Sequence, residues 1–260
     1  QHTELPPLAT AATAADAVAL HHARPGVLDG FELRPMEVQP PAADEVLIRV
    51  EAAGLNFRDV LTALGTYPGA GEIGLECCGT VLAAGAGVSH VRASDRVMAF
   101  HAGAFATHLV AHAAFVHPLP AGLPPAAAAT LPITFGTAWY ALAELAGLQR
   151  GDTVLIHAGA GGVGMAAVQI ALDRRARVFA TAGTAAKRSL LLGMGVEAAF
   201  DSRSPSFEAE VRAATGGDGV DVLVNSLIGE LLEASVRCVK AGGFFVELGK
   251  RELAQSQELA

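Results

Sequence analysis

The chain has 260 residues, of which 52% are hydrophobic and 17% charged, and its formal net charge is −8 at pH 7. This composition excludes a disordered chain, and the acidic balance argues against nucleic acid as a partner, because nucleic-acid binders carry a basic excess. Three cysteines are too few for a disulfide framework, which favours a reducing compartment. The sequence has no apolar run of the roughly 18 residues that a membrane span needs and no signal-peptide pattern, so we expect a cytoplasmic protein with no membrane partner.

The first half of the chain predicts a mainly β domain. Residues 1–12 are polar and rich in Pro and Ala, which is typical of a linker. From residue 13 to residue 132, short apolar runs alternate with turn signals, and we place the domain boundary near residues 130–135, after the Pro-rich stretch Pro118–Pro125. The expected strands include Glu45–Val50, Gly79–Ala83, Arg96–Phe100 and Ala106–Val110.

The second half, residues 133–260, changes rhythm, because apolar strand patterns now alternate with helical patterns. This alternation predicts βαβ units and therefore an α/β fold with a doubly wound parallel sheet. The expected strands are Thr153–His157, Arg177–Thr181, Val220–Asn225 and Phe244–Leu248. The expected helices are Val163–Leu172, Ala185–Leu192 and Leu231–Cys238.

A glycine-rich loop lies between the first expected strand and the first expected helix of this half. The loop reads Gly159-Ala160-Gly161-Gly162-Val163-Gly164, which fits G-x-G-x-x-G in the strand-to-helix context that a dinucleotide-binding motif requires. The first glycine permits a tight turn, the second lets the backbone approach a pyrophosphate, and the third lets helix and strand pack closely. The helix N-terminus then offers N–H groups to phosphate. The alternative is an ordinary glycine turn in an Ala-rich region.

The residues after the second expected strand favour NADPH over NADH. An NAD site usually carries Asp or Glu about 20 residues after the motif, where the acid bonds a ribose hydroxyl. The stretch Phe179–Ala186 contains no acid, and Lys187 and Arg188 follow it. A cation there can pair with the 2′-phosphate of NADPH. The alternative is that both cations are solvated helix residues.

Several motifs, taken together, resemble one protein family. They are Gly54-Leu55-Asn56-Phe57-Arg58-Asp59-Val60, Thr66-Tyr67-Pro68-Gly69, Gly74-Leu75-Glu76-Cys77, Ser94-Asp95-Arg96-Val97-Met98, Thr137-Ala138-Trp139-Tyr140, the glycine loop with His157 and Ala158, Asn225-Ser226-Leu227 and Glu247-Leu248-Gly249-Lys250. The chain resembles the zinc-independent branch of the medium-chain dehydrogenase/reductase superfamily. More narrowly, it resembles the enoyl reductase domain of polyketide synthases and animal-type fatty acid synthases.

The resemblance implies a GroES-like substrate domain over residues 13–132 and a Rossmann domain that binds NADPH over residues 133–260. It implies reduction of a trans-2-enoyl thioester on an acyl carrier protein, with hydride added at Cβ and a proton at Cα. The implied partners are neighbouring synthase domains such as a ketoreductase and a dehydratase, and a homodimer formed through the parent synthase. Family members continue beyond Lys250, so we expect the C-terminal part of the GroES-like domain to be missing.

Lys187 is the leading catalytic candidate that the resemblance implies. A lysine at this position is proposed as a proton donor in synthase reductases and binds the 2′-phosphate in quinone reductases, so both roles stay open. Many synthase reductases also carry an acid shortly after a Ser-Arg pair. Here Ser202-Arg203 is followed by Ser204-Pro205-Ser206-Phe207, and Asp201 lies before the pair. A water molecule or Lys187 alone would then deliver the proton.

Tyr67 and Asn56 are the other two catalytic candidates. The resemblance implies that Tyr67 protonates one face of an α-branched enolate, and the alternative is a tyrosine packed at a turn. Asn56 stands where relatives shape the nicotinamide end of the site, and its amide can bond a ribose hydroxyl or a carbonyl. We interpret Asp59 as an acid at a helix N-terminus and Glu76 as a buried structural acid.

No metal site is expected, because Asn56, Phe57 and Leu75 occupy the regions where zinc-dependent relatives carry Cys and His. Three histidines in the expected strand-and-loop region have no evident Cys or acid partner, and we interpret them as packed or surface residues. They are His101, His108 and His112.

Two alternatives to the synthase reductase stay open, namely a free-standing NADPH quinone reductase and a catalytically silent reductase-like domain. In each case the fold would be the same. The residues expected to bind the cofactor are Gly159, Ala160, Gly161, Gly162, Val163, Gly164, Thr181, Lys187, Arg188, Arg203, Asn225, Ser226, Leu227, Gly249 and Lys250.

Overall fold

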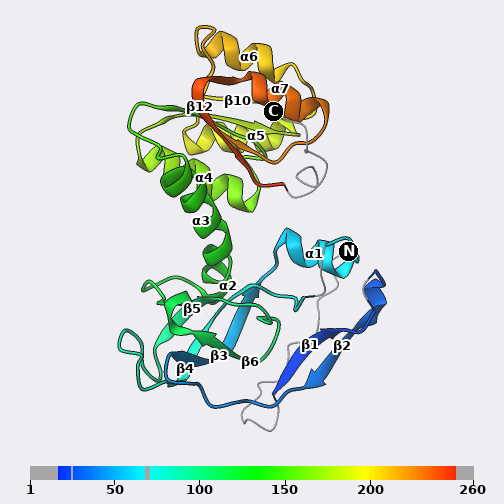
Figure 1. Ribbon diagram of the computed structural model, residues 1–260, viewed down its shortest axis with the longest axis vertical. Coiled ribbons are helices and arrows are strands. Elements are labelled where there is room, and N and C mark those ends of the chain that lie inside the picture. The colour runs from blue at the N-terminus through cyan, green and yellow to red at the C-terminus, as the bar shows by residue number, and fades with distance from the viewer. Residues whose placement is uncertain (1–16, 25, 68–70, 250–260) are drawn as a thin grey trace. The chain divides into compact units, whose positions relative to one another are not determined.

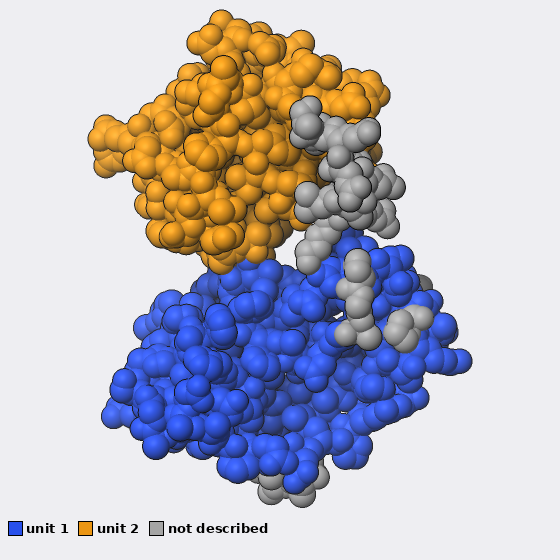
Figure 2. All heavy atoms as spheres, in the orientation of Figure 1, with its two compact units in different colours: residues 1–133 blue, residues 134–260 orange. Residues whose placement is uncertain are grey.

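The computed structural model describes residues 17–24, 26–67 and 71–249, so the expected linker over residues 1–12 lies outside the described residues. The chain divides into two compact units, residues 1–133 and residues 134–260, which Figure 1 and Figure 2 show. Each unit has its own β-sheet and its own hydrophobic core.

Unit 1 is built on a five-stranded antiparallel sheet with the strand order β6-β3-β4-β5-β7. The branched residues Val46, Ile48 and Val97 are fully buried in its core, as expected for strands that pack one face of a pleated surface. The strands are β3 (Glu45–Gly54), β4 (Glu76–Ala84), β5 (Arg96–Phe100), β6 (His108–His112) and β7 (Val116–Pro118).

Shorter elements complete unit 1. Strands β1 (Val18–His22) and β2 (Phe31–Pro35) form a two-stranded antiparallel sheet, and the short 3-10 helix η2 (Leu28–Gly30) lies between them. The other elements are helix α1 (Phe57–Ala63), the 3-10 helix η3 (Ala113–Phe115) and helix α2 (Pro125–Ala128). Helix α3 (Leu131–Trp139) begins in unit 1 and continues into unit 2, where the π-helix η4 (Tyr140–Leu145) follows it.

Unit 2 contains a five-stranded parallel sheet with the order β10-β9-β8-β11-β12. In sequence order this is 3-2-1-4-5, the doubly wound arrangement in which ligands bind at the carboxyl ends of the strands where the order reverses. The strands are β8 (Thr153–Ile156), β9 (Arg177–Ala182), β10 (Ala198–Asp201), β11 (Val220–Asn225) and β12 (Val239–Glu247). The helices between them are α4 (Gly162–Asp173), α5 (Ala185–Met194), α6 (Phe207–Ala214) and α7 (Glu230–Arg237).

Both faces of this sheet are covered by helices (Figure 1). Val154 and Ile156 of β8 pack into the cluster that contains residues of α4 and α5, and Leu155 between them packs into the cluster that contains residues of α6 and α7. Successive side chains of a strand point to opposite faces, so an unbroken apolar run is what a strand buried on both sides requires.

The predicted parallel sheet and mainly β unit are confirmed, and several boundaries are corrected. The strand expected at Ala106–Val110 lies two residues later, at His108–His112, and the strand expected at Thr153–His157 ends at Ile156. β10 and α6 were missed, because Ala198–Asp201 is only four residues long and α6 follows a stretch rich in Ser and Pro. β12 begins at Val239, where Gly242 and Gly243 hide the strand pattern.

Candidate functional site

The glycine-rich loop connects β8 to α4 in unit 2. The chain turns sharply at Ala158, whose φ is +48°, and the Gly161 N–H donates to the Ala158 carbonyl at 2.8 Å. The Gly159 N–H donates to the Thr181 carbonyl of β9 at 2.9 Å, which holds the loop against the sheet. Gly161 is the N-cap of α4, and no side chain in the part of the chain that the structure describes caps this helix. The first N–H groups of α4 therefore have no acceptor within the helix, and an anion such as a pyrophosphate can bind there.

Packing requires two of the glycines. A Cβ on Gly164 would overlap the Ala158 carbonyl oxygen and lie 2.7 Å from the Gly159 Cα, and a Cβ on Gly159 would lie 2.9 Å from the Ala180 Cβ. Gly161 is exposed, and the nearest atom to a Cβ there would be 3.1 Å away. Side-chain contacts at Gly159 and backbone contacts at Gly164 thus close the inner loop, whereas Gly161 and Gly162 on the outer loop are exposed. The other motif positions, Ala160, Gly162 and Val163, are half-buried or exposed.

His157, directly before the loop, is buried in a hydrogen-bonded chain. Its Nδ1 lies 2.9 Å from the Thr181 hydroxyl and its Nε2 lies 2.8 Å from the Ser235 hydroxyl. Because Ser235 donates its own proton to the Leu231 carbonyl, the His157 Nε2–H donates to Ser235, and Nδ1 accepts from Thr181. Burial lowers the pKa of His157 to about 3, so the ring is neutral at physiological pH.

Thr181 is one of the residues expected at the cofactor, and its side chain points elsewhere. The hydroxyl is fully buried and bonded to His157, so only the main chain of Thr181 reaches the loop, through its bond from Gly159. Thr181 therefore supports the loop through its main-chain carbonyl. The pairing of His157 with Ser235 was missed, because nothing in the local sequence links two residues 78 positions apart.

Arg188 is held within the protein at the end of β9. Its guanidinium donates to the Ala182 carbonyl at 2.9 Å and lies 3.4 Å from an Asp201 carboxylate oxygen. The other Asp201 oxygen accepts the Arg203 N–H at 2.9 Å. Asp201, the acid that precedes the Ser-Arg pair, therefore contacts both the Arg188 side chain and the Arg203 main chain.

Lys187 and Arg203 carry the accessible positive charges of this region. Lys187 lies in the first turn of α5, where its N–H bonds the N-cap Thr184 hydroxyl at 3.3 Å. The Arg203 side chain lies over the turn after β9, since a Cβ on Gly183 would be 2.8 Å from its Nε. Both side chains are exposed, and neither charged group pairs with another residue in the part of the chain that the structure describes. They are therefore available to an anionic ligand.

The ends of β11 and β12 are joined by Asn225. Its amide nitrogen donates to the Leu227 carbonyl at 2.8 Å and to a Glu247 carboxylate oxygen at 2.6 Å, and its amide oxygen accepts the Leu227 N–H at 3.1 Å. The other Glu247 oxygen accepts the Gly249 N–H at 2.5 Å. The buried Asn225 side chain therefore shapes the two strand ends, while the exposed Ser226 faces solvent. Lys250 lies outside the described residues.

In unit 1, Asn56 stands at the start of α1 between two buried acids. Its N–H donates to Asp59 at 2.9 Å, and its amide nitrogen donates to Glu76 at 2.9 Å. The second Asp59 oxygen accepts the Gly74 N–H at 2.8 Å. Asp59 thus has the helix N-terminal place expected for it, and Glu76 is a buried acid in contact with a candidate catalytic side chain.

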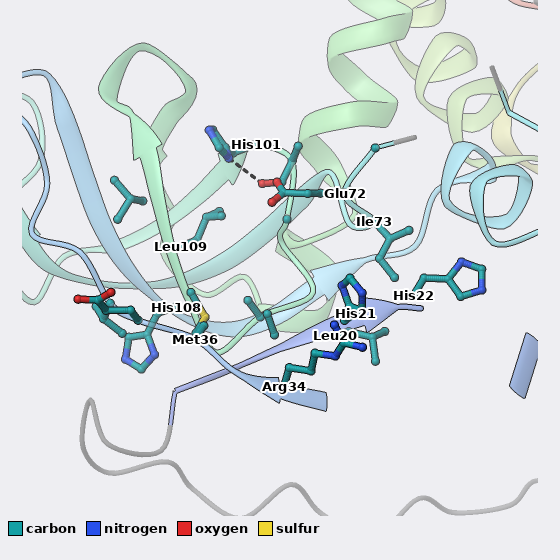
Figure 3. A pocket seen from close by; sticks show the side chains of 18 of the residues that line it. Leu20, His21, His22, Arg34, Met36, Glu72, Ile73, His101, His108 and Leu109 are labelled. Carbon is teal, nitrogen blue, oxygen red and sulfur yellow. Dashed lines mark hydrogen bonds between the residues drawn. The ribbon is translucent and has the colours of Figure 1, made fainter. Parts of the chain in front are cut away.

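Tyr67 lies next to Arg58 and lines an open cavity of about 1080 Å³ within unit 1. The Arg58 guanidinium sits 5.1 Å from the centre of the Tyr67 ring, which is the range of a cation–π contact. The cavity is lined by a mixture of apolar, acidic, basic and imidazole side chains. The lining residues labelled in Figure 3 are Leu20, His21, His22, Arg34, Met36, Glu72, Ile73, His101, His108 and Leu109.

His101 and His108 bond to groups near them in sequence, whereas His112 also has an acid partner that the sequence did not indicate, because its Nε2 lies 3.2 Å from an Asp44 carboxylate oxygen. His101 donates to the Ala102 carbonyl at 2.7 Å, His108 contacts the Thr107 hydroxyl at 3.0 Å, and His112 accepts the Ala114 N–H at 3.1 Å. Over residues 17–24, 26–67 and 71–249, no three His, Cys, Asp or Glu side chains are grouped so as to hold a metal ion. No helix in these same ranges has the length and apolar character needed to cross a membrane.

Two family models match the chain, one in each unit. Residues 42–121 match the alcohol dehydrogenase GroES-like domain, and residues 162–259 match the family described as zinc-binding dehydrogenase. The antiparallel unit and the parallel, doubly wound unit therefore correspond to the GroES-like and Rossmann folds that were predicted. The fold and these matches define a member of the medium-chain dehydrogenase/reductase superfamily.

Relatives narrow this class further. The chain is 46% identical over 241 residues to a phenolphthiocerol/phthiocerol polyketide synthase of Mycobacterium tuberculosis, and the match covers 91% of the chain but only 11% of that protein. It is 39% identical to the CurK enoyl reductase crystal structure, with a TM-score of 0.86, covering 92% of this chain and 76% of that one. The chain belongs to the family of polyketide synthase enoyl reductase domains.

A third relative is similar in fold and was solved with a nucleotide. The structure of mycobacterial Rv1454c complexed with NADPH is 32% identical, with a TM-score of 0.80, and the match covers 89% of this chain and 74% of that one.

Proposed function

We propose that the chain reduces the α,β double bond of a trans-2-enoyl thioester with NADPH, as one domain of a polyketide synthase. Residues 13–132 would hold the substrate and residues 133–260 the cofactor. The reaction adds a hydride at Cβ and a proton at Cα, and negative charge develops on the thioester oxygen in between. When bound, NADPH supplies the hydride.

The observation that carries the proposal is an open helix N-terminus together with two cations that have no partner among the described residues. The outer glycine loop and the free N–H groups of α4 follow β8, and Lys187 and Arg203 lie at the carboxyl ends of the adjacent strands β9 and β10. The first feature fits a pyrophosphate and the second fits a 2′-phosphate. No acid in the Phe179–Ala186 stretch is available for the ribose contact typical of NAD sites. The NADPH complex of the mycobacterial relative supports this assignment.

The remaining cofactor contacts would come from strand ends. Ser226, Leu227 and Gly249 follow β11 and β12. The Leu227 and Gly249 N–H groups already bond Asn225 and Glu247, so main-chain carbonyl groups there can bond the nicotinamide half of the cofactor. The Asn225 and Arg188 side chains bond within the protein, so we assign them to shaping these segments.

Lys187 keeps two proposed roles, and they predict different kinetics. If the ammonium binds the 2′-phosphate, Lys187→Ala raises KM for NADPH and leaves turnover with NADH unchanged. If it delivers the proton to Cα, the same substitution lowers kcat with both cofactors to a similar extent. Measuring kcat and KM with each cofactor therefore separates the two roles.

Tyr67 and Asn56 are the proposed substrate-side groups. The Tyr67 phenol can donate a proton to one face of the enolate, and Tyr67→Phe removes the proton without removing the ring. The Asn56 amide retains hydrogen-bonding capacity beyond its bond to Glu76, and it can bond a ribose hydroxyl or the thioester carbonyl.

The partners follow from the relatives, which are large polyketide synthases. We propose an acyl carrier protein as the carrier of the substrate, ketoreductase and dehydratase domains as neighbours, and a homodimer formed through the parent synthase. A dehydratase would supply the α,β double bond, because dehydration of a 3-hydroxyacyl thioester generates it.

The test is NADPH oxidation in the presence of a trans-2-enoyl thioester, followed at the nicotinamide absorbance, with a quinone as the comparison substrate. Consumption with the thioester and not with the quinone is the expected result. Turnover only with the quinone would instead assign the chain to the quinone reductases. Binding of NADPH without turnover on either substrate would indicate a silent reductase-like domain.

A further inference from the structure

The first turn of α3 is bound by a side chain from the sheet of unit 1. Ile133 is the last residue of unit 1, and its N–H lies in the first turn of α3, where no carbonyl of the same helix can accept it. This N–H donates instead to Glu76 Oε2 at 2.8 Å. Glu76 is the first residue of β4, so a strand end is joined to the helix that leads out of the unit.

The second oxygen of the same carboxylate holds Asn56. The Asn56 amide nitrogen donates to Glu76 Oε1 at 2.9 Å. An ionised carboxylate can only accept hydrogen bonds, so the amide nitrogen must face Glu76 and the amide oxygen must face away from it. Glu76 on the nitrogen side, together with the Asp59 N–H that the Asn56 side chain faces in the capping box of α1, therefore sets which way the Asn56 amide is turned.

The Glu76 carboxylate is closely surrounded by other parts of unit 1. Glu76 is 1% exposed, and β3 and β4 pair so that Gly54 lies opposite it. A Cβ at Gly54 would overlap both Glu76 Oε1 and the Ala129 carbonyl oxygen. A buried acid in this site keeps one geometry, because both of its oxygens are bonded.

The electrostatics of the site favour this arrangement only while the carboxylate is ionised. Burial raises the pKa of Glu76 and the nearby charge of Asp59 adds to the rise, while the bonds from Ile133 and Asn56 oppose it. A proton on either oxygen would turn that oxygen from an acceptor into a donor and break one of the two links. The partial positive charge at the start of α3 also favours the ionised form.

We propose that Glu76 is a positioning residue that orients the Asn56 amide and ties it to the first turn of α3. The position of the Asn56 amide at the substrate then depends on the position of the first turn of α3. This inference rests on the proposed function, because only that proposal puts Asn56 in contact with substrate or cofactor.

A double-mutant cycle on turnover tests it, with Glu76→Gln, Asn56→Ala and the double variant. Gln offers one acceptor to two N–H donors, so Glu76→Gln should lower kcat about tenfold in the wild-type background and less than twofold in the Asn56→Ala background. The NADPH dissociation constant should stay within twofold if Asn56 bonds the thioester carbonyl, and it should rise if Asn56 bonds a ribose hydroxyl of the cofactor. Glu51→Gln, a matched change at an exposed acid of β3, should leave kcat within twofold.

A merely structural role for Glu76 predicts an equal loss of kcat in both backgrounds, and that result would overturn the proposal, as would an unchanged kcat in Glu76→Gln. If Glu76→Gln does not fold, Glu76→Asp replaces it, since the shorter acid keeps the charge but cannot reach both donors.

Hydrogen exchange at the Ile133 amide supplies a readout that does not need turnover. Exchange should be at least about tenfold faster in Glu76→Gln than in the wild type and unchanged in Glu51→Gln. Equal exchange in the wild type and Glu76→Gln would overturn the tie to α3. A wild type that binds NADPH but does not reduce the thioester, with the exchange difference present, would reject the proposed function and with it the catalytic part of the inference, while the tie itself would stand.

Discussion

The two units present the charged side chains of their candidate sites in opposite ways. In unit 1, Asp59 and Glu76 are buried, and each uses both carboxylate oxygens within the protein. In unit 2, Lys187 and Arg203 are exposed, and their charges have no partner among the described residues. A buried charge is tolerated only when it is hydrogen-bonded, so the acids of unit 1 hold geometry. An unpaired cation beside an open helix N-terminus is suited to recruiting an anion.

This difference predicts which kind of substitution should damage each unit most. The cofactor side depends on backbone that comes close to a ligand, so an added atom should harm it more than a deleted side chain. The acid network depends on acceptors, so replacing one oxygen by an N–H group should harm it at constant size. The predictions below go from the largest expected effect to the smallest.

Gly164→Ala should have the largest effect. The new Cβ would meet the Ala158 carbonyl oxygen and the Gly159 Cα, and both are backbone atoms that cannot rotate away. We expect the NADPH dissociation constant to rise at least about 100-fold, which is about 2.7 kcal/mol. Titration of NADPH fluorescence measures it. Gly193→Ala is the matched control, because a Cβ at that position of α5 meets nothing within 4 Å, and affinity should not change.

Asp59→Asn tests the acid network at constant side-chain size. The amide keeps one acceptor oxygen and puts an NH₂ group in place of the other, so either the Asn56 or the Gly74 N–H loses its acceptor. An unsatisfied buried donor costs about 1–3 kcal/mol, and urea unfolding should show a loss of that size. Asp29→Asn changes an exposed acid of unit 1 in the same way and should stay within about 0.5 kcal/mol. Equal stability of the two variants would contradict a role for the Asp59 bonds.

Burial of the neutral His157 ring should lower the free energy of unfolding in mild acid. Its pKa is lowered from 6.5 to about 3 by burial, so between these values the unfolded chain binds a proton that the folded chain does not. Stability is therefore lost as the pH falls below about 6.5, and His157 alone should account for about 2 kcal/mol between pH 7 and pH 5. Urea unfolding at the two pH values measures this loss.

The control for the acid effect is a pair of substitutions. His157→Gln can still donate to Ser235 and accept from Thr181, and it should flatten the pH dependence because it does not titrate. His117→Gln at an exposed position of β7 should leave the slope unchanged. A slope that is the same in both variants would show that another group causes the acid loss.

The double substitution Lys187→Ala with Arg203→Ala should have the most selective effect. Removing the two exposed cations should weaken NADPH binding about tenfold, while NADH affinity and folding stability stay close to those of the wild type. Isothermal titration with each cofactor measures the ratio. An equal loss for NADPH and NADH would place these cations away from the 2′-phosphate.

The sequence was a good guide wherever local pattern carries the information. The apolar runs of the second half predicted β8, β9 and β11 nearly to the residue, because strands buried on both faces read as unbroken apolar segments. The glycine loop was predicted with its context, because its spacing reflects backbone packing against a neighbouring strand. The pattern was weaker at β10 and β12, where a short strand and two glycines leave little periodicity.

Roles that depend on where a side chain points could not be read in the same way. Thr181 lies at the end of β9 as expected, yet its hydroxyl turns into the core toward His157. Arg188 follows Lys187 in a run of two cations, yet Asp201 and a carbonyl of β9 engage it while Lys187 stays unpaired among the described residues. In each case the partner comes from an adjacent strand or from the segment that follows it.

The sequence by itself determined the class of fold, the loop that can accept a pyrophosphate and the residues from which a phosphate site can be made, since these follow from periodicity, spacing and residue type. Only the tertiary structure decided which polar groups are paired. Glu76 and Ile133 are 57 positions apart, and His157 and Ser235 are 78 apart. Such bonds arise where strand pairing and helix packing bring distant residues together in a dry core, so no local pattern records them.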